Sequence, residues 1–231
     1  MTAETIQYEP DSSPEDIVNK AADILLSGGV IVYPTDTSYG IACDPRIEAA
    51  ADRLIEIKRR DPNLGLPLLF SGFSQCESYH DFGELERILT KLFWPGALTL
   101  VVKAKTDIPA TVTGRRDSIA VRVPDHIVPR GIAAKIDGPI VGTSANRHGG
   151  PSPFSIAIAQ EQLGDEVDLY IDAGTSDASK NSTIIGVELG TPANIKVYRE
   201  GELSIERLTE SLRVDGDALQ FWTNRIVYAD M

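Results

Sequence analysis

Short apolar runs rich in β-branched residues alternate irregularly with amphipathic helical segments along this chain of 231 residues. The apolar runs predict strands at residues 30–34, 66–70, 97–104, 119–124, 139–144, 168–172, 182–187 and 195–200. Helical spacing of apolar residues predicts helices at 14–27, 47–60, 84–93, 129–136, 156–163 and 205–212. Because the helices do not separate the strands regularly, we expect an α/β fold with a mixed sheet instead of a doubly wound parallel one.

Neither a repeat nor a long linker interrupts this pattern, so we expect one domain, residues 1–201, followed by a short extension, residues 202–231. A packing helix near Trp222 is expected in the extension. No apolar run approaches the ~18 residues that span a bilayer, which predicts no membrane contact. The acidic start of the chain lacks the apolar stretch of a signal peptide. With two cysteines and no CxxC motif, the expected location is the reducing cytoplasm.

Charge is distributed unevenly. The chain carries 22 basic and 34 acidic residues, a net charge of −12, which argues against indiscriminate nucleic-acid binding. Residues 91–135 reverse this balance, with eight basic residues against three acidic ones. A basic middle in an acidic protein suggests an internal anionic ligand, although an ordinary solvated face explains it equally well.

The familiar catalytic and nucleotide-binding signatures are missing. GxxxxGK[ST] and GxGxxG are absent, so neither a P-loop nor a dinucleotide fingerprint is present. The three histidines form no HExxH motif, and no GxSxG marks a hydrolase serine. Anions must therefore be bound by Lys and Arg side chains, hydroxyl groups and backbone amides.

Two candidate loops lie early in the chain. The segment 34–40, PTDTSYG, offers three hydroxyl groups after a strand and suits a small polar ligand, but it is also an ordinary turn. Lys58 and Arg60 end a predicted helix, where the macrodipole favours cations. Residues two apart point about 200° from each other on a helix. The two can therefore reach one anion only if the helix breaks between or just after them, as Pro62 allows.

Two further loops lie in the second half. Arg122 stands between Val121 and Val123 in a predicted strand, so it either lies on a solvated face or meets a carboxylate or phosphate. The segment 142–146, GTSAN, follows a strand and is itself followed by GGPSP. Small side chains at a strand end let a phosphate approach the backbone amides.

A set of motifs lies between about Gly28 and Gly201: YPTDTSYG, KxR, WPGALTLV, SIAVRVP, TSAN with PSP, NSTII and YREG. In their order and spacing these motifs resemble the TsaC/YrdC family of threonylcarbamoyl-AMP synthases. The resemblance implies an open, twisted mixed sheet flanked by helices, with a concave basic cavity. It also implies condensation of L-threonine, bicarbonate or CO2 and ATP to threonylcarbamoyl-AMP with release of pyrophosphate. A separate threonylcarbamoyl-transferase complex would then modify adenosine 37 of tRNA, giving t6A.

The family's functional residues map onto this chain by motif. The resemblance assigns L-threonine to Thr37, Arg122, Thr143 and Ser182, with Arg122 on the α-carboxylate. It assigns the reacting centre to Lys58, Arg60, Ser144 and Asn146. It assigns ATP to Arg60, Ser118, Ser144, Ser152 and Arg199. Mg²⁺ is expected with the ATP phosphates, and no metal site formed by protein side chains is expected.

Two departures from the family pattern stand beside the KxR motif: Asp61 where a proline is common, and Leu64 where a polar or basic residue often approaches ATP. A YciO-like branch, similar in fold but with weak or different activity, is the alternative within the superfamily. The related domain of hydrogenase-maturation carbamoyltransferases belongs to much longer chains. A non-catalytic module that binds double-stranded RNA is the alternative from another class. A tRNA contact by a synthase and the basis of threonine-over-serine selectivity stay open.

Overall fold

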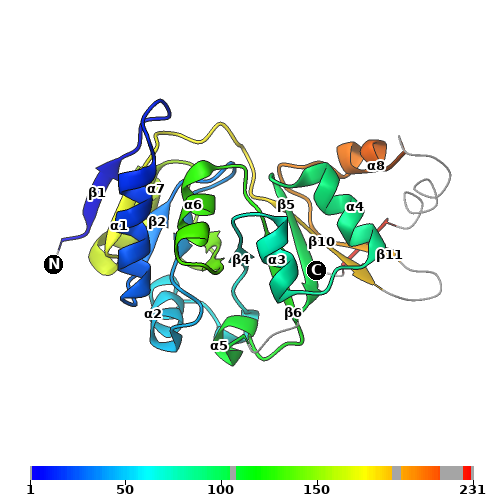
Figure 1. Cartoon of the computed structure of the whole chain (residues 1–231), viewed down its shortest axis with the longest axis horizontal. Helices are drawn as coiled ribbons and strands as arrows, with labels where there is room; N and C mark the ends of the chain where they lie inside the picture. Colours follow the sequence, from blue (N-terminus) through cyan, green and yellow to red (C-terminus); the bar gives the residue numbers. More distant parts are fainter. Residues whose placement is uncertain (1, 105–107, 189–193, 214–225, 230–231) are drawn as a thin grey trace.

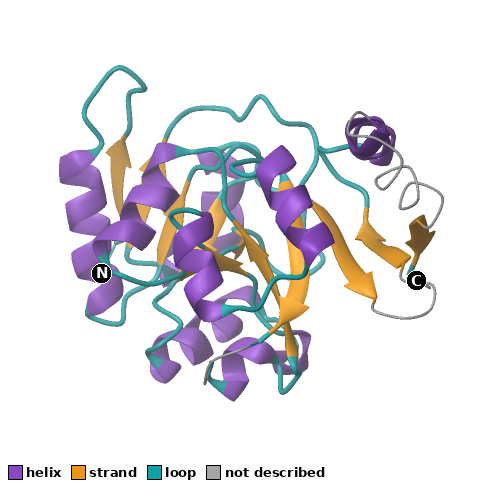
Figure 2. Ribbon diagram, turned by 45° about the vertical axis from the view of Figure 1, so that its right-hand side comes forward, coloured by secondary structure: helices purple, strands orange, loops and turns teal. Residues whose placement is uncertain are grey.

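The computed structural model describes residues 2–104, 108–188, 194–213 and 226–229. Within these residues the strands form two mixed sheets with helices packed against them, which confirms the predicted α/β class (Figures 1 and 2). We expected one mixed sheet, whereas hydrogen bonding divides the strands between two. None of the described helices is long and apolar enough to cross a membrane.

The first sheet has five strands in the order β1-β9-β2-β3-β8. They are β1 (Glu4–Gln7), β9 (Leu169–Asp172), β2 (Ile31–Tyr33), β3 (Gly40–Ala42) and β8 (Thr143–Ser144). The first three are parallel, and β3 runs antiparallel to both neighbours. Side chains alternate between the faces of a strand. Accordingly Leu169 and Ile171 pack in one apolar cluster with helices α1 and α6, while Tyr170 packs in the other with α2 and α7.

Those four helices lie close to where the sequence predicts them. They are α1 (Glu15–Leu26), α2 (Glu48–Lys58), α6 (Ile127–Lys135) and α7 (Ile156–Leu163). The N-cap position of α1 holds Pro14, one residue after the expected Ser13, whose hydroxyl oxygen accepts the Glu15 amide at 3.4 Å. On α1, Val18, Ala21 and Leu25 form the buried face that the apolar spacing predicts.

The second sheet has seven strands in the order β12-β11-β10-β5-β6-β4-β7. They are β12 (Ile226–Tyr228), β11 (Asn194–Arg199), β10 (Thr183–Glu188), β5 (Leu98–Lys103), β6 (Ser118–Arg122), β4 (Leu68–Leu69) and β7 (Ile140–Val141). Neighbouring pairs alternate between parallel and antiparallel across this sheet. The helices of this half are α3 (Phe73–Tyr79), α4 (Glu84–Phe93), α5 (Ala110–Thr113) and α8 (Ile205–Arg213).

The C-terminal part of the chain joins the same structure. Helix α8 buries Leu208 and Leu212 in the larger apolar cluster, and β12 pairs with β11. The predicted helix at 205–212 is confirmed, whereas Trp222 lies outside the described residues. Sequence patterns missed several short elements: β1, β3, β12, α3, α5 and the 3₁₀ turns η1 (Pro62–Leu64) and η2 (Gly164–Glu166).

The two sheets meet at Gly142. The prediction of one strand over 139–144 is wrong, because β7 ends at Val141 in one sheet and β8 begins at Thr143 in the other. A Cβ atom at Gly142 would lie 2.2 Å from Cγ of Leu69, so only glycine fits where the backbone passes β4. The Gly142 amide donates to the Pro67 carbonyl at 2.8 Å. Gly142 also lines the cavity described next.

Candidate functional site

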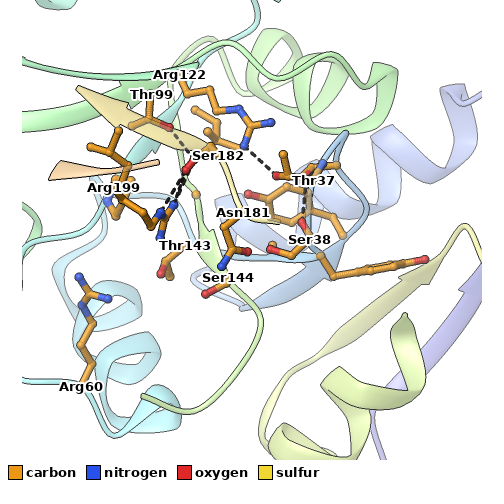
Figure 3. Close-up of a pocket in the computed structure, with 18 residues that line it drawn as sticks. Thr37, Ser38, Arg60, Thr99, Arg122, Thr143, Ser144, Asn181, Ser182 and Arg199 are labelled. Atoms are coloured by element: carbon orange, nitrogen blue, oxygen red, sulfur yellow. Dashed lines mark hydrogen bonds between the residues drawn. The ribbon is translucent and has the colours of Figure 1, made fainter. Parts of the chain in front are cut away.

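A cavity of about 740 Å³, its open mouth included, lies at the junction of the sheets (Figure 3). Three arginines line it: Arg60, Arg122 and Arg199. Hydroxyl groups line it as well, from Thr35, Thr37, Ser38, Thr99, Thr143, Ser144 and Ser182. Among the described residues that line it, none is acidic. The arrangement suits a small anionic ligand, because cations and hydroxyl donors face it without carboxylates to neutralise them.

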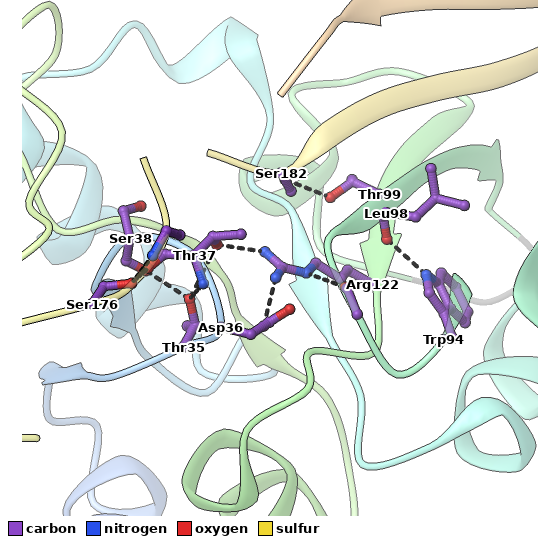
Figure 4. Close-up of polar contacts among 12 residues, drawn as sticks. Thr35, Asp36, Thr37, Ser38, Trp94, Leu98, Thr99, Arg122, Ser176 and Ser182 are labelled. Atoms are coloured by element: carbon purple, nitrogen blue, oxygen red, sulfur yellow. Dashed lines mark hydrogen bonds and ion pairs between the residues drawn. The ribbon is translucent and has the colours of Figure 1, made fainter. Parts of the chain in front are cut away.

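Arg122 ends β6 and is buried, with its guanidinium held from two sides (Figure 4). One terminal nitrogen donates to Asp36 at 2.6 Å, the other donates to the Thr37 hydroxyl at 2.9 Å, and Nε donates to the Gly96 carbonyl at 2.8 Å. The expectation that an arginine between two apolar strand residues meets a carboxylate is thus confirmed, and the alternative of a solvated face is wrong.

The 34–40 segment is a turn and also lines the cavity. The Thr35 hydroxyl accepts the Thr37 amide at 3.0 Å and donates to the Ser38 carbonyl at 2.7 Å, which closes the turn on itself. Ser176, from the distant loop after β9, donates to the Thr37 carbonyl at 2.5 Å. The segment is thus a turn, as one interpretation expected, and it holds the Thr37 hydroxyl beside Arg122 at the cavity, whereas its binding of a small polar ligand stays a prediction.

Ser182 lies at the opposite wall, directly before β10. Its hydroxyl is hydrogen-bonded to that of Thr99 on β5 at 2.9 Å. Arg199 of β11 donates through Nε and a terminal nitrogen to the Ser182 carbonyl, at 3.0 and 2.9 Å. Neighbouring strands thus bring together two residues that are 17 positions apart in the chain. One cavity brings together five residues that the resemblance assigns to L-threonine or ATP: Thr37, Arg122, Thr143, Ser182 and Arg199.

The KxR motif is divided by the backbone. Helix α2 ends at Lys58, two residues before the predicted end, because Arg59 adopts a left-handed conformation with φ of 50°. This break directs the two neighbours differently. Lys58 is 2% exposed, and its ammonium group donates to the carbonyls of Ser144 and Asn146, the latter at 2.7 Å. Arg60 lines the cavity, whereas Lys58 is not among the described lining residues.

Burial lowers the pKa of both cations. Burial, together with the nearby charge of Arg60, lowers the pKa of Lys58 to about 7. A neutral amine still has two N–H groups, one for each carbonyl that it contacts. Burial and the neighbouring Arg116 also lower the pKa of Arg60, against the opposing effect of Asp61. In the described part of the chain Arg60 forms no ion pair with a carboxylate, and its guanidinium contacts the carbonyls of Leu64 and Gly65. Its cationic surroundings favour an anionic ligand.

The TSAN segment follows the junction glycine. Thr143 and Ser144 line the cavity, and the Ser144 hydroxyl donates to Oδ1 of Asn146 at 2.5 Å. Asn146 is buried behind the wall and donates through Nδ2 to the Gly150 carbonyl at 2.8 Å. Ser152 accepts a 2.8 Å hydrogen bond from Asn181, which lines the cavity. Asn146 and Ser152 therefore stand one residue behind the surface that a ligand would contact, and their assigned roles stay predictions.

A second hollow of about 560 Å³ adjoins the first and shares Arg60, Pro67 and Ile184 with it. Ser118 and Arg116 line this hollow, and its walls are otherwise largely apolar, with Leu64 and Ile119 among them. Ser118, which the resemblance assigns to ATP, thus lies in a different hollow from the residues assigned to L-threonine. Arg60 lines both hollows. A ligand with an apolar ring and an anionic tail fits this division.

Several residues that line or adjoin the two hollows were not assigned a role from the sequence. Asp36 sits next to Thr37 in the sequence, and the buried Arg122 signals the need for such a carboxylate. Thr99 is a polar residue inside the apolar run of β5, and that position in the sequence could have indicated it. Asn181 opens the NSTII motif and Arg116 belongs to the basic stretch of residues 91–135, but neither was assigned a role, because only the tertiary structure brings their loops near the two hollows.

The donor set does not fit a metal ion held by protein side chains. Among the described residues no group of three or more His, Cys, Asp or Glu side chains lies together. Asp36, next to the cavity wall, is paired with Arg122. Hard divalent cations require several oxygen ligands, usually with carboxylates among them.

Comparison with known proteins identifies relatives along most of the chain. The Sua5/YciO/YrdC family model, described as telomere recombination, matches residues 23–201. The threonylcarbamoyl-AMP synthase of Idiomarina loihiensis is 33% identical over 78% of this chain and 96% of that protein. The one of Alkalilimnicola ehrlichii is 37% identical over 76% of this chain and 93% of that protein.

Solved structures agree with this relationship. P. abyssi Sua5 complexed with L-threonine is similar with a TM-score of 0.83 and 28% identity, over 92% of this chain and 61% of that one. The chain thus spans less than two thirds of the Sua5 length. E. coli YciO is similar with a TM-score of 0.76 and 26% identity, over 86% of this chain and 96% of that one. With its motifs, its fold and its matched residues in agreement, the chain belongs to the Sua5/YciO/YrdC family.

Proposed function

We propose that this protein is an L-threonylcarbamoyladenylate synthase, a nucleotidyltransferase that supplies the precursor of t6A37 in tRNA. The observation that carries the proposal is the cavity lined by three arginines and several hydroxyl groups, with no acidic residue among its described lining residues. Relatives named threonylcarbamoyl-AMP synthase and the L-threonine complex of Sua5 support it.

The amino-acid end is proposed to lie at Arg122. A guanidinium has five N–H groups, and three of those of Arg122 are used by Asp36, Thr37 and Gly96. Two remain for the two oxygens of the threonine carboxylate. Thr37, Thr143 and Ser182 supply the surrounding hydroxyl groups.

The nucleotide is proposed to extend from the second hollow into the cavity. Its base and ribose would lie near Ser118 and Leu64, and its phosphates would lie against Arg60, Ser144 and Arg199, with Ser152 behind them. Mg²⁺ would arrive on the phosphates as part of the substrate, because the described residues do not form a metal site. Lys58 would act behind the wall, through the carbonyls of the TSAN segment.

The reaction forms two bonds, and their order stays open: either the carbamate forms first or bicarbonate is activated first. In the carbamate-first order the neutral threonine amine attacks CO2 and loses a proton to solvent, which gives a carbamate. A carbamate oxygen then bonds to the α-phosphorus while the bond to the bridging oxygen breaks and pyrophosphate leaves. Both reactants of the second step are anions, so the arginines would act by positioning and charge neutralisation, without a protein nucleophile. In the cytoplasm the product would pass to a threonylcarbamoyl-transferase complex and tRNA.

The test is pyrophosphate release from ATP and bicarbonate, with and without L-threonine. We expect threonine-dependent release by the wild type and its loss in Arg60→Ala and Lys58→Ala. Arg130→Ala is the matched control, because Arg130 also donates to a backbone carbonyl but does not line the cavity. Release that survives in both variants would keep the enzyme and remove these site assignments.

Absence of release from a folded wild-type protein would contradict the proposal. The YciO-like alternative would then be favoured, in view of the similarity to E. coli YciO. Binding to double-stranded RNA with a steep salt dependence, without need for ATP or threonine, would instead favour the RNA-binding module.

A further inference from the structure

Two cavity residues carry a buried polar atom without a hydrogen-bond partner in the described part of the chain: Nε of Arg60 and Oδ1 of Asn181. A buried polar atom without a partner is costly, so such atoms at a binding site call for pairing by the ligand. Nε of Arg60 is a donor and suits the anionic groups already assigned to the cavity. Oδ1 of Asn181 is an acceptor, and none of the assignments above gives it a partner.

The Asn181 amide is held in place by its surroundings. Its Nδ2 donates to the Ser152 hydroxyl at 2.8 Å, which leaves Oδ1 unpaired. The loop just before it is fixed by Glu202, whose carboxylate accepts the amides of Ser179 and Lys180 at 3.1 and 3.0 Å. In Figure 3 the amide lies between Ser182 and Ser144. The Ser152 contact therefore sets the orientation of the amide, which leaves an unpaired acceptor on a residue that lines the cavity.

We propose that Asn181 is a specificity-determining residue whose Oδ1 accepts an N–H of the substrate's α-amino group. The proposal rests on the proposed function. One amino acid can contact both residues, because Arg122 and Asn181 line the same cavity and the α-amino group is on the carbon atom that carries the carboxylate. The carboxylate has no hydrogen to donate, whereas the amine has.

A neutral acceptor is chemically appropriate at this position. The amine must be unprotonated to attack CO2, and a carboxylate beside it would raise its pKa and stabilise the unreactive ammonium form. An amide oxygen orients the amine without that effect. The lack of acidic residues among the described lining residues is consistent with the same requirement.

The test compares the binding of two threonine analogues by calorimetry, without ATP. (R)-3-hydroxybutyrate lacks only the amino group, and L-2-aminobutyrate lacks only the hydroxyl group. We expect Asn181→Ala to weaken L-threonine binding on the order of 10-fold, as for a lost hydrogen bond to a charged or strongly polar group. It should leave (R)-3-hydroxybutyrate binding unchanged, because that contact is already missing. Asn19→Ala, on α1 and outside the cavity, is the matched control.

A second variant tests whether Asn181 lies beside the reacting amine, through the pH dependence of the reaction. Asn181→Asp should move the pH profile of threonine-dependent pyrophosphate release to higher pH, because the added carboxylate raises the pKa of the bound amine. Asn181→Ala should lower the rate without this displacement. A merely structural role would not produce that difference.

The outcomes separate the two proposals. Wild-type protein that binds no L-threonine overturns the proposed function and this inference with it. Two other outcomes overturn this inference alone, provided that the wild type binds L-threonine. In the first, Asn181→Ala also weakens the binding of (R)-3-hydroxybutyrate. In the second, Asn181→Ala weakens the binding of L-threonine but not that of L-2-aminobutyrate. In the latter case Asn181 recognises the hydroxyl group.

Discussion

The ammonium group of Lys58 and the backbone carbonyl of Asn146 are joined by a 2.7 Å hydrogen bond that links the end of α2 to the TSAN segment. The same ammonium group contacts the Ser144 carbonyl, and the Lys58 carbonyl accepts the His148 amide at 2.8 Å. A lysine from a motif typical of anion binding thus supports the segment that carries Ser144. This geometry makes the role of Lys58 separable from that of Arg60.

Replacing Lys58 by Met should lower the free energy of unfolding, because one buried and one partly buried carbonyl lose their donor, at about 1–3 kcal/mol for the buried one. The difference from wild type should depend on pH. The pKa of Lys58 is about 7 in the folded protein and near 10.5 unfolded, so the unfolded chain binds more protons between these values.

The free energy of unfolding of the wild type should therefore rise between about pH 7 and 10, by up to about 1.4 kcal/mol per pH unit, through Lys58. Lys58→Met should lack this contribution. Urea unfolding of both proteins at several pH values measures it. Parallel pH curves for the two proteins would contradict the assignment.

Removing the carboxylate beside Arg122, by Asp36→Asn, should raise KM for L-threonine more than it changes kcat. The guanidinium loses its 2.6 Å ionic contact and with it the orientation of its free N–H groups. Breaking a buried pair costs about 3–5 kcal/mol of stability, so unfolding is measured in parallel. Glu4→Ala, which removes an exposed pair with Lys20, is the control and should change stability by less than about 1 kcal/mol. An unchanged KM in folded Asp36→Asn would show that Arg122 does not need Asp36.

Arg116 should contribute to ATP affinity through the second hollow, beside Arg60. Arg116→Ala should raise KM for ATP several-fold at low ionic strength and less at high salt, because screening weakens the contribution of an exposed charge. KM for L-threonine should not change. Arg115→Ala is a close control, because Arg115 is the exposed neighbour that does not line the hollow. Equal effects of the two substitutions would indicate a general charge effect.

Gly142→Ala should destabilise the protein by about 1–3 kcal/mol, since the added methyl group would lie 2.2 Å from Cγ of Leu69. Thermal unfolding checks this. Gly72→Ala is the control, because nothing lies within 4 Å of a Cβ at that position. Shortening Leu69 to Ala in the Gly142→Ala background should restore part of the loss, and independent, additive effects would argue against the contact.

Sequence patterns predicted most regular elements because these depend on local periodicity. The long runs at 97–104, 119–124 and 182–187 became β5, β6 and β10 with boundaries shifted by one or two residues. Where the pattern failed, at 139–144, a single glycine moved the chain from one sheet to the other. No periodicity signals that event, because it depends on the approach of Leu69 from another strand.

By itself, the sequence determined the α/β class and, through the order of its motifs, the family to which the chain belongs. Only the tertiary structure decided how the motif residues are used. It paired Arg122 with Asp36 across 86 positions of chain and directed Lys58 to backbone carbonyls and Arg60 to the cavity. It also brought Asn181 into the same cavity as Arg122. The physical reason is that these contacts join segments that are distant in the sequence. Their geometry is set by the packing of the two sheets and not by the local conformational preference of any residue.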